Sequence, residues 1–237
     1  MKPVVRTGGS NACIETAVYM PPPPETSQDT TRHRLLHAAS EEFARDGFTA
    51  ASVRAICDAA DANVSAVKYY FGSKEKLYLS VWEVAAAEMV SKEPMPRVED
   101  FDDPRAALRA FIAWFMRLVL TEKDAHPIAG RLLAHETVAP TPGALDVFVR
   151  NCAGPIKSEV ARIVDAIIGS RLPGKQHGDV VFAVIALCVN AKHSREILTL
   201  LGHPPPTTRA GINRMASVMA DFAISGLDGF AKQQETR

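Results

Sequence analysis

The sequence predicts an all-α fold, in which a small N-terminal head of three helices precedes a larger helical body. Three observations support this prediction. From Thr30 onward, apolar residues recur at helical spacing. Alternating apolar and polar runs with Asn-Gly or Asp-Gly turns, the pattern of paired strands, are nearly absent. Prolines recur at the borders of the helical segments, where the missing amide hydrogen costs least.

Short helices with polar caps make up the predicted head. Gly47 ends the first helix, because glycine tolerates backbone angles that stop a helix. Ser52, Asn63 and Ser73 precede the next three, and their side-chain oxygens suit N-cap positions. The second and third helices are separated by a tight break at Asp61, which is typical of a helix-turn-helix. The expected helices of the head cover residues 31–46, 52–60 and 63–71, and the next helix, 74–91, joins the head to the body.

The body begins after a linker that contains Pro94, Pro96 and the acidic stretch 99–103. Pro155 predicts a kink or break inside one of its helices. The longest apolar run, Val180–Val189, is too short to span a bilayer and indicates a buried helix. The expected helices of the body cover residues 104–123, 127–138, 143–170, 177–201 and 208–230.

The chain is therefore expected to have three parts. Residues 1–29 are predicted to be a disordered leader, since Gly8–Asn11 and Pro21–Pro24 cannot continue a helix. Met20 directly precedes the proline run, so translation starting there is an alternative to Met1. Residues 30–77 form the predicted helix-turn-helix head, and residues 78–237 the predicted body.

Composition excludes several classes of protein. The 237 residues carry 27 Lys and Arg against 27 Asp and Glu, which argues against a histone-like polycation or an acidic tail. The four cysteines form no C-x-x-C pair, so neither a zinc ribbon nor a disulfide framework is expected. No signal peptide is visible in the first 20 residues. We expect a cytoplasmic protein without a membrane partner, metal or cofactor.

The third helix of the head has the composition of a helix that reads DNA. Its exposed side chains are expected to be the small Val64, Ser65 and Ala66, which would let it enter a major groove about 12 Å wide. Lys68 and Tyr69 suit phosphate oxygens, whereas Tyr70 points about 100° away and is expected to pack. The predicted DNA-binding residues are Arg32, Ser52, Arg54, Asn63, Val64, Ser65, Ala66, Lys68, Tyr69 and Lys74.

The stretch FTAASVRAICDAADANVSAVKYYFGSKEKL at residues 48–77 resembles the TetR family of bacterial transcriptional regulators. The residues that carry the resemblance are Phe43, Gly47, Phe48, Ser52, Val53, Ile56, Ala59, Ala60, Phe71, Ser73, Lys74, Glu75 and Leu77. Asp61 replaces the usual turn glycine, and Lys68 stands where a tyrosine often contacts phosphate. Aspartate tolerates a left-handed turn better than most residues, and lysine is itself a phosphate partner.

The body has a second resemblance, to the C-terminal domain of the CecR branch of TetR regulators. It is carried by Arg131–Glu136 and by Pro140-Thr141-Pro142 before a long helix. The resemblance implies a helical domain that senses a small-molecule effector and forms a homodimer. Aromatic side chains of the body are more often core than ligand cage, but they would line a pocket if one exists. The predicted ligand-binding residues are Phe111, Trp114, Arg131, His135, Phe148 and Asn190.

The last two helices are predicted to form the dimer interface. The run Val180–Val189 is apolar all round, so it must be covered on more than one side. Ile212, Met215, Met219 and Phe222 form an apolar stripe on the final helix. Two such helices from each subunit would form a four-helix bundle. The alternative is that both helices belong to the core of a single subunit.

Together these patterns predict a homodimeric regulator that binds a double-stranded DNA operator and is a repressor released by a small-molecule ligand. The head has a net charge of only +1 over residues 30–77, so few phosphate contacts are expected. One alternative is therefore a TetR-like regulator that has lost DNA binding and binds proteins. A helical enzyme is the other alternative, but no catalytic constellation is readable in the sequence.

Overall fold

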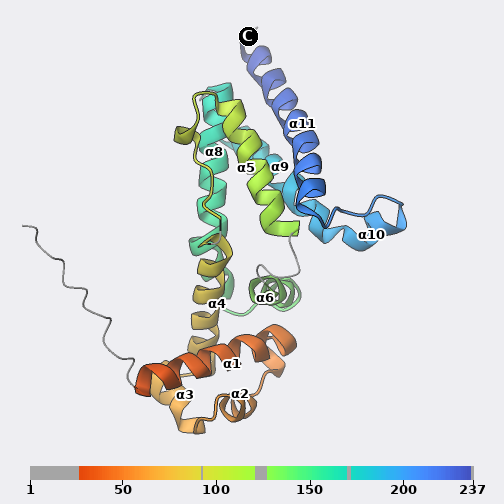
Figure 1. Cartoon of the computed structure of the whole chain (residues 1–237). Helices are drawn as coiled ribbons and strands as arrows, with labels where there is room; N and C mark the ends of the chain where they lie inside the picture. The colour runs from red at the N-terminus through yellow and green to blue at the C-terminus, as the bar shows by residue number, and fades with distance from the viewer. Residues whose placement is uncertain (1–26, 92, 121–126, 170–171, 236–237) are drawn as a thin grey trace, which may run out of the picture.

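The computed structural model describes residues 27–91, 93–120, 127–169 and 172–235. Within these ranges the protein is all-α, which confirms the predicted fold class. Helices α1 to α3 lie at one end, and α4 leads from them towards the larger helical group (Figure 1). The helices are α1 Ser27–Ala50, α2 Val53–Ala59, α3 Val64–Phe71, α4 Lys74–Ser91, α5 Pro104–Leu120, α6 Pro127–Val138, α7 Ala144–Phe148, α8 Gly154–Ile168, α9 Gly174–His193, α10 Arg195–Leu200 and α11 Arg209–Glu235.

The helices of the head follow the sequence prediction closely. Gly47 leaves the helical conformation, with φ 72° and ψ 175°, so the regular part of α1 ends where predicted. Helix α4 has the predicted bounds, and so does α6 in the body. The predicted leader is wrong at its last three residues, because α1 already begins at Ser27. The rest of the leader, Met20 included, lies outside the described residues.

Two long helices predicted in the body are interrupted. The segment predicted at 143–170 consists of α7, a π-helical turn at Val149–Ala153 and α8. Pro155 explains the turn, because proline has no amide hydrogen and its ring collides with the carbonyl of the preceding turn. The segment predicted at 177–201 is divided into α9 and α10, which are separated at Ser194.

The buried residues form two apolar clusters. One is built on α1 to α4 and contains Phe43, Tyr78 and Trp82. It also includes Leu132 of α6 and Val147 of α7, so these two body helices pack on the head. The predicted domain boundary at residue 77 stays a prediction, but this apolar cluster continues across it.

The second apolar cluster joins α5, α8, α9 and α11. Helices α5 and α11 lie along each other, and Arg105 of α5 donates to Asp228 of α11 with Nε 3.1 Å from Oδ1. A 3-10 turn, η1, at Val98–Asp100 fastens the linker to α8, because the amide of Val98 donates to the buried Glu159 over 2.7 Å. This cluster is the core of the body.

Two further observations bear on the chemical class of the protein. None of the described helices is long and apolar enough to cross a membrane. Cys57, Cys152 and Cys188 are buried free thiols, while Cys13 lies outside the described residues. Burial raises the pKa of Cys152 to about 11 and that of Cys188 to about 12, so both stay protonated near neutral pH.

Candidate DNA-binding surface

The turn between α2 and α3 is held by side-chain caps at both helices. The Ser52 hydroxyl accepts a hydrogen bond from the amide of Ala55, 3.4 Å away, and so caps α2. Asp61 has a φ of 48°, so it adopts the left-handed conformation that its place in the turn requires. Asn63 Oδ1 accepts from the amide of Ser65 at 2.9 Å and caps α3. The structure confirms both predicted caps.

Helix α3 presents one face to solvent and packs the other on the head. Tyr69 is 71% exposed and Val64 is 49% exposed, and both lie on the outer face with the exposed Lys68. Val67 is buried on the inner face. Tyr70 is half-buried against the head core, as predicted. The outer face therefore offers a base-reading surface with a lysine and a tyrosine further along the helix.

Ser65 and Ala66 differ in their surroundings. Ser65 is exposed, and its hydroxyl donates to Asn63 Oδ1 over 2.9 Å. Ala66 is half-buried against the head core, so the prediction that its side chain is exposed was wrong. The physical reason is the helical period, which turns Ala66 towards the side of α3 that also carries Tyr70. Val64 and Ser65 are the small side chains best placed to meet bases.

Cations surround α3, and two of them rest on aromatic rings of the head. Lys74 lies 4.8 Å from the centroid of Phe48, and its Nζ donates to the carbonyl of Thr49 over 3.4 Å. The Arg32 guanidinium lies 5.3 Å from the centroid of Phe71. These contacts orient both charged groups before any DNA is bound. Arg54 on α2 is exposed.

The charged groups of the head that lie outside its ion pairs are mostly positive, and all of residues 30–77 are described. Four of its six acids are held in ion pairs. Glu42 and Asp46 both contact Arg45, Asp61 lies 3.5 Å from Arg34, and Glu41 is paired with Arg131 of the body. The other charged groups of the head are Arg32, Arg54, Lys68, Lys74 and Lys76, against Asp58 and Glu75. Lys76, which is also exposed, was missed as a candidate contact.

The predicted ligand-binding residues do not all lie at one place. Phe111 and Trp114 are buried in the body core, where Trp114 Nε1 donates to the carbonyl of Glu93 at 2.9 Å. Phe148 packs edge-on against Trp82, with centroids 5.7 Å apart. Asn190 is exposed on α9 and accepts from the Ser194 hydroxyl over 3.0 Å.

The last two residues of that set lie where α6 meets α1. Arg131 pairs with Glu41 at 3.1 Å, and His135 contacts the carbonyl of Ala44. Spacing in the sequence could not show where the six predicted ligand-binding residues lie relative to one another. They are spread over α5, α6, α7 and α9, and the relative positions of these helices depend on tertiary packing. Their joint role in one ligand site stays a prediction.

A buried polar group at the same junction was not among the predicted site residues. Glu136 of α6 is 1% exposed and accepts hydrogen bonds from the Tyr78 hydroxyl and the Thr141 amide, both at 2.6 Å. Burial and the nearby Glu136 raise the pKa of Tyr78, so this hydroxyl stays protonated and donates. In the sequence Glu136 looks like an ordinary charged residue of a helix surface.

Comparisons with known proteins agree with the geometry of the head. Residues 35–81 match the family model described as bacterial regulatory proteins, tetR family. Residues 104–229, more than half of the chain, match the C-terminal domain of the HTH-type transcriptional dual regulator CecR. The chain belongs to the TetR family. The resemblance predicted from residues 43–77 and that of the body are both confirmed.

Individual relatives of this TetR-family protein match parts of it. It is 41% identical over 86 residues to the HTH-type transcriptional repressor NicS of Pseudomonas putida. The matched stretch covers 36% of this chain and 40% of NicS. It is 29% identical over 151 residues to CecR of Shigella flexneri, covering 60% of this chain and 66% of CecR. The matched stretches thus span less than two thirds of either relative.

Solved structures show the same fold. The flavonoid-responsive regulator FrrA superposes with a TM-score of 0.61 at 20% identity, covering 83% of this chain and 96% of FrrA. A transcriptional regulator from Rhodococcus sp. Rha1 has a TM-score of 0.55 at 19% identity, covering 81% and 96%. The likeness to these structures shows the fold, and the two family models show that the chain belongs to a family of transcriptional regulators.

Proposed function

We propose that the protein binds a DNA operator as a homodimer and represses transcription until a small-molecule effector releases it. The observation that carries this proposal is the outer face of α3, where exposed Val64, Ser65, Lys68 and Tyr69 follow a capped turn. The surplus of cations around that face supports contact with phosphates. The same surplus of cations disfavours the alternative that the protein is a TetR-like regulator that has lost DNA binding. We also propose that the protein acts in the cytoplasm.

A mobility shift with duplexes taken from the DNA flanking its own gene tests the proposal. We expect a specific complex whose affinity falls steeply as salt is raised, because bound phosphates release counterions. Repeating the shift with a library of small molecules tests release by an effector. Failure to prefer any flanking duplex over unrelated DNA would contradict operator binding and favour a regulator that acts through protein contacts.

Dimerisation is proposed to occur through α9 and α11. Phe182 of α9 is 69% exposed, and Phe222 of α11 is 71% exposed. Between the two helices lies a cavity of about 360 Å³ whose lining includes Val184, Phe222 and Leu227. Large exposed apolar groups next to a groove are typical of an interface, and a two-fold axis would let one surface cover its own copy.

The structure also refines the stripe predicted on the last helix. Ile212 is buried within the subunit, Met215 and Met219 are half-buried, and Phe222 faces solvent. Only part of that stripe is thus available to a partner. On α9, Val180 and Val184 face the body core, while Phe182 faces outward. In the proposed dimer the two α3 helices would lie about one turn of DNA apart, roughly 34–36 Å.

Replacing Lys68 by alanine should weaken binding to all duplexes by a similar factor. Lys68 is exposed on α3 and is proposed to contact a phosphate, which carries no sequence information. The slope of log affinity against log salt should fall by about 1. Fluorescence anisotropy over a salt series measures both effects. Lys157→Ala, at an exposed lysine of α8, is the control; equal slopes for Lys68→Ala and the parent would contradict the phosphate contact.

Enlarging Ser65 should instead change which sequence is preferred. A Ser65→Gln substitution places a long side chain with an amide on the outer face of α3, and an amide of this kind can pair with adenine in the major groove. Ser65→Ala is the control of similar size. Selection of bound duplexes from a randomised pool should give a different consensus for Ser65→Gln; an unchanged consensus and footprint would refute base reading at this position.

A further inference from the structure

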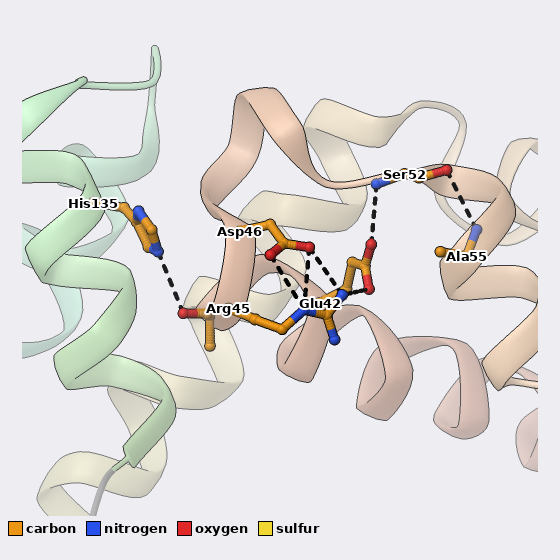
Figure 2. Close-up of polar contacts among 7 residues, drawn as sticks. Glu42, Arg45, Asp46, Ser52, Ala55 and His135 are labelled. Carbon is orange, nitrogen blue, oxygen red and sulfur yellow. Dashed lines mark hydrogen bonds and ion pairs between the residues drawn. The ribbon is translucent and has the colours of Figure 1, made fainter.

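Consecutive residues of α6 contact α1 of the head and α4, the helix that leads from the head to the body. His135 is directed at the end of α1, as Figure 2 shows, and its Nε2 donates to the carbonyl of Ala44 over 3.3 Å. A Cβ on Gly47 would lie 2.9 Å from Nδ1 of His135, so the imidazole rests directly on the backbone at the kink of α1. The position of α6 therefore constrains where α1 bends.

Polar contacts connect the last turns of α1 to the start of α2. Glu42 is 8% exposed, and its Oε1 accepts from the amide of Ser52 at 3.3 Å (Figure 2). Its other oxygen binds Arg45, which also contacts Asp46. The Ser52 hydroxyl in turn caps α2. A displacement of the end of α1 would therefore be passed to α2, which precedes the α3 turn.

Glu136 secures α4 from the neighbouring position of α6. Its carboxylate is bound by the Tyr78 hydroxyl of α4 and by the Thr141 amide beyond the end of α6. Tyr78 also packs edge-on against Phe43 of α1, with ring centroids 4.8 Å apart. A carboxylate buried without hydrogen bonds is costly, so this geometry is favoured over positions of α4 that would break either bond.

We propose that His135 and Glu136 are positioning residues for operator binding. Neither touches DNA in this proposal; together they set the angle of α1 and α4 on α6, and hence the separation of the two α3 helices in a dimer. The proposal rests on the proposed function, because it assumes that two heads dock on one operator. It adds that residues of α6 determine which half-site spacing the dimer accepts.

The test uses the full chain and synthetic duplexes built on the footprinted site from the DNA flanking its own gene. One duplex keeps the natural half-site spacing, and two others have it lengthened or shortened by one base pair. We compare the parent with His135→Ala and Tyr78→Phe. Thr137→Ala is the matched control, since Thr137 is an exposed residue of α6 whose hydroxyl bonds only to the carbonyl of Ala134 among the contacts described.

The parent and Thr137→Ala should bind the natural spacing at least about 10-fold more tightly than the altered ones. His135→Ala and Tyr78→Phe should lower this preference to within about 3-fold, while circular dichroism and dimer mass stay those of the parent. Loss of affinity by an equal factor on all spacings would overturn the proposal, since that is the result of a merely structural role. Unchanged binding on every duplex would overturn it as well.

Two outcomes separate this proposal from the proposed function. If either variant fails to fold, His135→Asn and Glu136→Gln replace it, because both retain a polar group of similar size, and the same spacing preference decides. If the parent binds none of the duplexes, the proposed function fails, and the positioning role is rejected with it. If the parent binds and the variants discriminate spacing as the parent does, the positioning role alone is rejected.

Discussion

A Gly47→Ala substitution should lower the free energy of unfolding by about 4 kcal/mol, the combined cost of backbone strain and overpacking. Gly47 has φ 72° and ψ 175°, a region that residues with a Cβ rarely adopt. The added methyl group would also lie 2.9 Å from Nδ1 and 3.2 Å from Cγ of His135. Rotation of the imidazole about χ2 leaves Cγ in place, so relief requires a different χ1 rotamer of His135 or a shift of α6.

Urea denaturation followed by circular dichroism measures this loss. Gly72→Ala is the matched control, because Gly72 also has a positive φ of 82° but a Cβ there would meet only the Lys76 side chain, at an ordinary 3.5 Å from Cδ and 3.9 Å from Nζ. The control should lose about 1–2 kcal/mol from strain alone. An equal loss in the free energy of unfolding for Gly47→Ala and Gly72→Ala would refute the contact with His135. In a double variant with His135→Ala, part of the loss should be recovered.

A Phe222→Asp substitution should convert the proposed dimer to a monomer and lower operator affinity by about 100-fold or more. An aspartate at this position would place a charge inside the proposed apolar interface, where it is strongly disfavoured. Without the dimer, the second head is no longer held at a high effective concentration near its half-site. Because Phe222 is 71% exposed in a single subunit, the fold itself should lose little stability.

Sedimentation velocity and mobility shift measure the two effects on the same preparations. Val138→Asp is the control, since Val138 is an exposed apolar residue at the end of α6, a helix that packs on α1 and α4. It should leave both the dimer and the affinity at the parent level. A Phe222→Asp protein that remains dimeric would show that α9 and α11 do not form the interface.

The head was predictable because its information is local. Ser52 and Asn63 cap helices that begin at the next residue, and Asp61 occupies a turn that four consecutive residues define. Such patterns depend on contacts between neighbours in the chain, and so does the placement of Tyr69 outward and Tyr70 inward. The exception is Ala66, whose small side chain fits either an exposed or a half-buried position.

The arrangement of the body was less predictable. The division between α9 and α10 at Ser194 has no proline or glycine to mark it, unlike the π-helical turn before Pro155. The predicted ligand-binding set was chosen by residue type, and type does not show whether an aromatic ring fills a core or lines a cavity. Trp114 proved to be a core residue whose indole is bonded to the linker carbonyl of Glu93.

The fold class, the helix-turn-helix and the family could be predicted from the chain, because each of these depends on periodicity, caps and motif spacing. How α6 is joined to the head depends instead on contacts between residues far apart in the chain. His135 meets Ala44 and Glu136 meets Tyr78 across sequence separations of 91 and 58 residues. The distribution of charge on the head also depends on contacts between residues distant in sequence, such as the ion pair of Glu41 with Arg131. Because ion pairs hold most of the acids of the head, most of its remaining charged groups are cations.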